Sequence, residues 1–166
     1  MSSRIEYLVQ HLDLQAHPEG GFYAPAFRSE QVLDTTTLNG SWKRPRTLYS
    51  SIFFLLTANH HSSWHRIASD EIWHLYEGDD ICVHILHPDG SYSQERLSNK
   101  VGKEKFSAIV KAGCWFASHC EGALGYSLSG CTLAPGFDFE DFELGNTQEL
   151  IKVYPEYAEI IKKYAK

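Results

Sequence analysis

The sequence predicts an all-β fold in which an antiparallel barrel makes up most of the chain. Between Phe22 and about Cys131, short runs rich in β-branched and aromatic residues alternate with turn sequences. One of these turns, Pro88-Asp89-Gly90, is typical of a hairpin connection. Many short strands with no helical pattern between them favour a sandwich or barrel over a parallel α/β sheet.

The expected strands are apolar runs that end at glycine- or aspartate-containing turns. They are Leu48–Thr57, Ile72–Tyr76, Ile81–Leu86, Ser107–Val110, Cys114–Ala117 and Ala123–Thr132.

Helical patterns occur at the two ends of the sequence. Ser3 and Glu6 have the spacing of a capping box, so a short helix is expected at about residues 3–13. Leu, Tyr and Ile repeat at helical intervals over about residues 147–165, where Pro155 suits the start of a second short helix. The Tyr-rich face of this segment must cover an apolar surface, either the outside of the barrel or another subunit.

Length and charge narrow the class of protein. With no internal repeat or linker in 166 residues, we expect a single domain over residues 1–166, with the barrel at about 20–145. A net charge of −6 argues against nucleic acid or an anionic membrane surface as the main partner. No stretch approaches the roughly 20 apolar residues of a membrane helix. The N-terminus lacks the features of a secretory signal, so a cytoplasmic location is expected.

The four cysteines show no C-x-x-C spacing, and three of them lie in apolar, strand-like runs. Reduced core thiols are therefore expected rather than disulfides or a zinc cluster. The cysteines are Cys82, Cys114, Cys120 and Cys131.

Histidines and carboxylates are concentrated between residues 60 and 74. His65 lies in a strand-like run, and Glu71 opens the next strand after a short turn, so the two can lie across from each other. Such a pair can act as a general acid and base or as two metal ligands, although a His near Trp residues is also commonly structural. Strict alternation places His74 on the face opposite Glu71, unless a β-bulge turns it inward.

Two short segments resemble known motifs. Ser63-Trp64-His65, followed by Glu71 and Gly78, resembles the first cupin motif, in which H-x-H precedes a Glu and a Gly. Lys111-Ala112-Gly113 with Trp115-Phe116 resembles the second, P-x-G-x-x-H.

Longer segments resemble one branch of the cupins, the uncharacterised cupin-five family, a domain of unknown function. They are His17-Pro18-Glu19-Gly20-Gly21-Phe22-Tyr23, Arg28-Ser29, Ser69-Asp70-Glu71-Ile72-Trp73-His74 and Ala134-Pro135-Gly136-Phe137-Asp138-Phe139. The resemblance runs from about Leu14 to Leu144. It implies a double-stranded β-helix, the cupin jelly-roll barrel, which is commonly dimeric and similar to sugar-nucleotide epimerases and plant storage proteins.

The resemblance also bears on cofactors. The metal-binding cupin pattern uses three His and one Glu, and here Ser63 and Phe116 stand at two of the His positions. His65 and Glu71 remain, whereas catalytic zinc sites usually keep three protein ligands. No cofactor is therefore expected, and the alternative is a divalent metal held by His65, Glu71 and His74.

Other polar and aromatic residues are expected to bind the ligand. Arg28 follows the Glu-Gly-Gly segment, and its guanidinium can hold a carboxylate or phosphate, with a surface ion pair as the alternative. For Arg46 we prefer the surface ion pair. Glu19 either lines the pocket mouth or caps a turn. The ligand-binding set is Glu19, Arg28, Ser51, Phe53, Ser63, Phe116 and Tyr126.

These features predict a small-molecule-binding cupin of unknown substrate. It would be an isomerase, epimerase or lyase acting on a sugar-like or carboxylated metabolite, with His65, Glu71 and His74 as catalytic residues. One alternative is a non-catalytic ligand-binding barrel, and a second is a metal-dependent cupin enzyme. A homodimer is also expected, because the aromatic first strands and the Tyr-rich tail would expose much apolar surface on a monomer.

Overall fold

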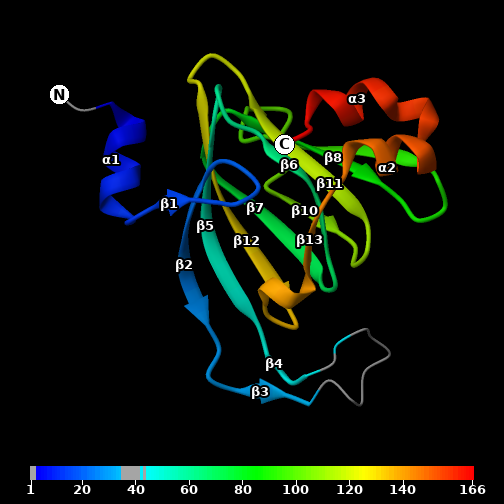
Figure 1. The fold of residues 1–166 in the computed structure, drawn as a ribbon. Helices are drawn as coiled ribbons and strands as arrows, with labels where there is room; N and C mark the ends of the chain where they lie inside the picture. Colours follow the sequence, from blue (N-terminus) through cyan, green and yellow to red (C-terminus); the bar gives the residue numbers. More distant parts are fainter. Residues whose placement is uncertain (1–2, 35–41, 43) are drawn as a thin grey trace.

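The computed structural model describes residues 3–34, 42 and 44–166, which form β-sheets around a central core, with helices near both ends of the chain (Figure 1). The sheets are antiparallel, and short helices lie on either side of them in sequence. The predicted all-β fold with terminal helices is confirmed.

The two main sheets contain six and five strands. The six-stranded sheet has the order β1 (Gln15–Ala16), β2 (Phe22–Arg28), β5 (Ser50–Thr57), β12 (Tyr126–Ala134), β7 (Asp70–Gly78) and β10 (Ser107–Val110). The five-stranded sheet has the order β13 (Phe142–Leu144), β6 (Ser62–Ile67), β11 (Trp115–Glu121), β8 (Asp80–Leu86) and β9 (Tyr92–Leu97). A separate pair consists of β3 (Val32–Leu33) and β4 (Arg46–Thr47).

Consecutive strands alternate between these sheets through the middle of the chain. β5, β7 and β12 belong to the six-stranded sheet, whereas β6, β8 and β11 belong to the five-stranded one. The chain therefore crosses from sheet to sheet as it winds around the core (Figure 1). As a result, His65 on β6 and Glu71 on β7 are close in sequence but are carried by different sheets.

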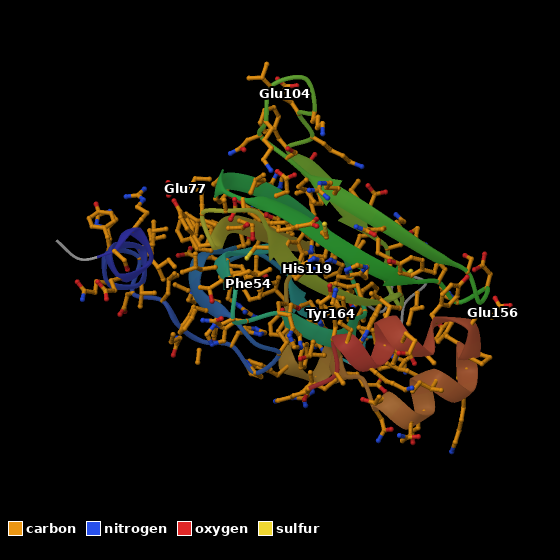
Figure 2. The ribbon with its side chains drawn as sticks, turned by 90° about the horizontal axis from the view of Figure 1, so that it is seen from above. Phe54, Glu77, Glu104, His119, Glu156 and Tyr164 are labelled. Atoms are coloured by element: carbon orange, nitrogen blue, oxygen red, sulfur yellow. The ribbon has the colours of Figure 1, made fainter. Side chains whose placement is uncertain are left out.

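Apolar side chains fill the space between the sheets. On β7, Trp73 and Leu75 are buried while Ile72 and His74 are half-buried, as expected where alternate residues face opposite sides. Phe54, labelled near the centre of Figure 2, belongs to the same core. Other members include Leu56, Ile81, Val83, Ile85, Leu97, Phe116 and Leu133.

The N-terminal helix α1 (Arg4–His11) begins with the predicted capping box. The Ser3 hydroxyl accepts a hydrogen bond from the Glu6 N–H at 3.2 Å, and the Ser3 N–H donates to the Glu6 carboxylate at 2.8 Å. Leu8 is buried with Leu14 and Leu55 in a small core on the outer side of the six-stranded sheet.

The C-terminal segment forms two short helices, α2 (Thr147–Val153) and α3 (Ala158–Lys163), joined by a 3-10 turn, η3 (Pro155–Tyr157). Tyr154 and Tyr164 are buried against the five-stranded sheet. The Tyr-rich face therefore covers the outside of the barrel (Figure 1). The predicted homodimer stays a prediction.

No helix of the described residues is long and apolar enough to span a membrane.

All four cysteines are free, and Cys120 alone among them is half-buried rather than buried.

Arg46 does not form the expected surface ion pair, because it is only 4% exposed. Its guanidinium instead forms a buried ion pair with Asp141 in the 3-10 turn η2 (Phe139–Asp141), at 2.7 Å.

Trp64 on β6 links α3 to the barrel through a side-chain hydrogen bond, so a substitution at this position tests how the C-terminal helices are held. Its indole N–H donates to the carbonyl of Ile161 at 3.1 Å in a buried site. Trp64→Phe keeps an aromatic ring but leaves that carbonyl unpaired, so we expect a loss of about 1–3 kcal/mol in unfolding free energy. Thermal unfolding followed by circular dichroism should show a midpoint lower by roughly 3–10 °C.

Trp115→Phe is the matched control. The Trp115 ring packs against the same cluster beneath the guanidinium of Arg66, and its indole N–H makes no hydrogen bond to the described residues. An equal loss of stability in both variants would show that ring volume, rather than the hydrogen bond, holds α3 in place.

Candidate functional site

A cavity of about 220 Å³ lies inside the barrel, between the six-stranded sheet and strands β6 and β13 of the other sheet. One end is polar, with two histidines and two glutamates: His17, Glu19, His65 and Glu71. The other end is aromatic and carries Arg28. The cavity therefore combines mainly apolar walls with a few polar groups, as small-molecule sites do.

Glu19 and His65 are joined at the polar end. The carboxyl Oε2 of Glu19 lies 3.0 Å from Nε2 of His65, and both side chains are buried. Nδ1 of His65 lies 2.8 Å from the Ser63 carbonyl, so this nitrogen carries a proton and donates it. The Ser62 hydroxyl donates to the other oxygen of Glu19 at 2.8 Å.

Burial sets the protonation of this pair. Loss of hydration lowers the pKa of His65 to about 3, so its imidazole is neutral. The same cause, with the nearby Glu71, raises the pKa of Glu19 well above its usual range. The two effects agree with the hydrogen bonds, because a neutral His65 that donates from Nδ1 must accept at Nε2. A Glu19 carboxyl that carries a proton can donate it to this nitrogen, 3.0 Å away, and the pair is then uncharged.

The turn that carries Glu19 depends on two glycines. Gly20 has φ +115°, a conformation that favours glycine, and a Cβ there would lie 2.1 Å from the His61 carbonyl oxygen. The close approach lets the Glu19 carbonyl accept the Ser63 N–H at 2.8 Å. The Glu-Gly-Gly segment thus fixes Glu19 against β6.

His17 supports the same turn from the other side. Its Nδ1 accepts the Glu19 N–H at 3.3 Å, and burial lowers its pKa to about 4, so it is neutral. The ring packs edge-on against Tyr23 and Phe54.

Glu71 lies in the cavity without a comparable partner. It is 5% exposed, and its Oε2 makes no hydrogen bond to any of the described residues. Burial raises the pKa of Glu71 to about 7, although the Cys131 thiol and the Trp73 indole lower it in part. The indole N–H of Trp73, although near enough to Glu71 to contribute to this lowering, is buried and forms no hydrogen bond of normal geometry within the described part of the chain. Unpaired buried polar atoms of this kind are costly, so a bound molecule is an obvious partner for them.

The opposite end of the cavity is formed by aromatic rings and one cation. Phe137, Phe139 and Phe142 pack edge-to-face with one another, and Phe27 lies on the other side. Arg28 donates one guanidinium N–H to the Phe137 carbonyl at 2.9 Å. The contact orients its charge at the cavity wall.

Five of the predicted site residues line this cavity. They are Glu19, Arg28, Ser51, His65 and Glu71. The expected partner of His65 differs, because Glu19 rather than Glu71 bonds to it. Ser51 accepts a hydrogen bond from the Thr132 hydroxyl at 3.0 Å.

The other predicted site residues lie outside the cavity lining. Ser63 contributes its backbone carbonyl, and the residue lines a separate hollow beside the C-terminus. Phe116 packs on the ring of His65, with centroids 3.9 Å apart. His74 stands on the face of β7 opposite Glu71. Phe53 packs against Tyr76, and the Tyr126 hydroxyl donates to Glu77.

The sequence prediction missed several lining residues: His17, Tyr23, Cys131, Phe137 and Phe142. The sequence offered one signal for His17, since it begins the His-Pro-Glu-Gly-Gly segment that also contains the predicted residue Glu19. The others look like ordinary core residues in the sequence.

The cavity does not fit the metal ion that the metal-binding cupin pattern implies. Ser63 does not line this cavity, and Phe116 packs on the His65 ring. Nε2 of His65 is already bonded to Glu19. Within the described residues, no three ligand-type side chains of the cavity bring their donor atoms within 4.8 Å of one another.

Comparisons with known proteins agree with this fold. A protein of Shewanella oneidensis is 32% identical, with a TM-score of 0.86 and coverage of 100% of this chain and 99% of that one. A hypothetical protein from Leishmania major is 31% identical, with a TM-score of 0.88 and coverage of 99% of each chain. A cupin 2 domain-containing protein from Halorhodospira halophila shares the fold alone, at 8% identity and a TM-score of 0.57, over 92% of this chain and 87% of that one.

A search of curated proteins finds no match. The family model described as "Cupin superfamily (DUF985)" matches residues 6–145, which is most of the barrel and the Glu-Gly-Gly turn. The resemblance noted in the sequence is confirmed, and the chain belongs to this family of the cupin superfamily.

Proposed function

We propose that the cavity binds a small carboxylated or sugar-like metabolite and transfers a proton on it, as an isomerase, epimerase or lyase does. The observation that supports this most directly is Glu71, a buried carboxyl with an unpaired oxygen and a pKa of about 7. A general acid or base works best when its pKa lies near the operating pH. Glu71 meets that requirement and is free to reach a ligand.

In this proposal His65 has a positioning role rather than the proton-transfer role first expected for it. Nδ1 of its ring bonds to the Ser63 carbonyl, and the Glu19 carboxyl lies 3.0 Å from Nε2. Its low pKa leaves it a weak base. The neutral His65–Glu19 pair would instead keep the polar end rigid and uncharged, so that Glu71 is the group that changes protonation.

Arg28 would select for an acidic ligand. One of its N–H groups is bonded to Phe137, and the rest of the guanidinium remains to meet a carboxylate or phosphate. Arg28 is itself exposed to solvent at this end of the cavity, so such a charge-assisted bond would be partly screened by water. A ligand that spans the cavity would then place its acid group at Arg28 and its reacting carbon toward Glu71.

A non-catalytic ligand-binding barrel is the second candidate. The observation that favours it is the closed set of contacts among Ser62, Glu19, His65 and the Ser63 carbonyl, in which each polar side chain already has a protein neighbour. In that case Glu71 would only bind the ligand by a hydrogen bond.

The protonation of Glu71 can be tested through stability. A carboxyl whose pKa is raised by folding stabilises the protein fully below its unfolded pKa of 4.5, and this stabilisation is lost as pH rises through about 7. Glu71→Gln removes this dependence. Between pH 5 and pH 8, wild type should lose about 2 kcal/mol of unfolding free energy relative to the variant. Denaturant unfolding at the two pH values measures the change.

Glu77→Gln is the control on the same strand. Its hydrogen-bonded ion pair with Arg4 lowers the pKa of Glu77, so the carboxylate is ionised above pH 5 in the folded protein. The stability gap between this variant and wild type should stay nearly constant from pH 5 to pH 8. A constant gap for Glu71→Gln as well would contradict a raised pKa at Glu71.

Proton transfer can be tested once a ligand is found. A thermal-shift screen of sugar phosphates, nucleotide sugars, uronates and small hydroxy acids should reveal a stabilising compound. In deuterated water, wild type should exchange a carbon-bound proton of that compound with solvent. Glu71→Gln should slow the exchange by about 100-fold or more while binding changes little. Arg28→Gln should weaken binding by about tenfold.

His74→Gln serves as the control, because His74 lies on the other face of the strand that carries Glu71. It should leave both binding and exchange unchanged. A compound that binds tightly to wild type but undergoes no exchange or conversion would favour the non-catalytic barrel.

A further inference from the structure

The five-stranded sheet carries a second group of reactive side chains on its outer face. Cys82 on β8 lies directly across from His119 on β11, and Glu121 follows two residues later on the same face. One ligand atom from each of these three residues lies within 4.8 Å of the others. The sheet itself sets this spacing, since cross-strand neighbours and alternate residues share a face.

We propose that Cys82, His119 and Glu121 bind a zinc ion. A thiolate, an imidazole and a carboxylate are all common zinc ligands, and three protein ligands leave a fourth position open. Softer sulfur and nitrogen donors favour zinc over magnesium or calcium, which prefer oxygen alone. On binding, the Cys82 thiol gives its proton to solvent, and the thiolate and the Glu121 carboxylate balance the two positive charges of the ion.

The groups around His119 hold its ring in place. Tyr164 and His119 lie close together in Figure 2, with the Tyr164 hydroxyl 2.9 Å from Nδ1 of His119. Nε2 of His84 is 3.2 Å from the same nitrogen, and the two imidazoles stack. Nδ1 is thus occupied, which leaves Nε2 for the ion. Outer hydrogen bonds of this kind typically orient the histidine ligands of metal sites.

Arg96 is the group that occupies this position in the structure. Its guanidinium lies 2.7 Å from Glu121 and 3.9 Å from the Cys82 sulfur, so it now supplies the positive charge. The side chain is 48% exposed and can move away. Its other partner, Asp80, keeps hydrogen bonds or ion pairs with Ser98 and Lys100. Displacing Arg96 therefore leaves no buried carboxylate unpaired.

This site is separate from the cavity. Alternate residues of β11 face opposite sides, so Phe116 points toward His65 while His119 points toward α3. Zinc binding at the outer face does not require any residue of the proposed catalytic group. The zinc site and the proton-transfer function of the cavity can therefore be refuted independently.

Titration of the chelator-treated full-length protein with cobalt(II), followed by competition with zinc, tests this proposal. We expect one cobalt ion per chain, a thiolate-to-cobalt charge-transfer band in the near ultraviolet, and loss of that band when zinc is added. Cys82→Ser should abolish the band. Glu121→Gln should weaken cobalt binding by about tenfold or more. Arg96→Gln should strengthen binding, since the competing cation is removed.

Two controls keep the outcomes distinct. Cys120→Ser changes the neighbouring thiol on β11, which packs against the central core, and should retain the band. Glu71→Gln alters the cavity and should also retain it. Glu121 is half exposed, so its variant should fold even if Cys82→Ser, at a buried position, does not. Absence of the band in wild type, its survival in folded Cys82→Ser, or unchanged affinity in Glu121→Gln would each overturn the proposal.

Discussion

The close contact between Glu19 and His65, with 3.0 Å between the carboxyl oxygen and the ring nitrogen, is the interaction on which the candidate site depends. Its two residues come from the β1–β2 turn and from β6, so it ties the edge of the six-stranded sheet to a strand next to the edge of the other sheet. The backbone bond from the Ser63 N–H to the Glu19 carbonyl runs beside it. Together they join the two sheets at the polar end of the cavity and keep Glu19 away from water, and this burial raises the pKa of its carboxyl well above the usual range.

The winding of the strands supplies the rest of the site. Because β6 and β7 belong to different sheets, the short turn between them brings His65 and Glu71 to the cavity from two sides without pairing them directly. Glu71 is thereby buried among apolar groups and keeps an unpaired oxygen. The strand β11 also contributes residues to both faces of its sheet. Phe116 packs on His65 at the inner face, and His119 stacks on Tyr164 at the outer face.

The sequence was sufficient to predict the fold, the capping box and five cavity residues. Alternation along β7 also indicated that His74 would face away unless a bulge intervened, and the observed irregularity in the β7–β12 pairing lies beyond it, at Leu128/Ser129. Sequence could not identify Glu19 as the partner of His65, because the contact joins residues 46 positions apart through a turn whose path depends on the whole barrel.

Burial was the other quantity that sequence could not supply. Arginine is usually a surface residue, yet Arg46 and its ion-pair partner Asp141 in η2 are both buried. Cys82 likewise gave no zinc signal, because the other ligand-type side chains beside it are a histidine and a glutamate on a neighbouring strand rather than a second cysteine. Such groupings arise from strand register, which local patterns do not encode.

The burial of the polar end has a thermodynamic consequence. Burial lowers the pKa of His65 and His17 and raises that of Glu19 well above its usual range, and the pKa of Glu71 is about 7, so Glu71 is the group whose charge changes near neutral pH. An anion that enters would be repelled by an ionised Glu71 and so would bind better when this carboxyl is protonated. Ligand binding and proton uptake by Glu71 are then coupled. The ligand binds more tightly to the protonated protein, and ligand binding in turn raises the fraction of Glu71 that is protonated.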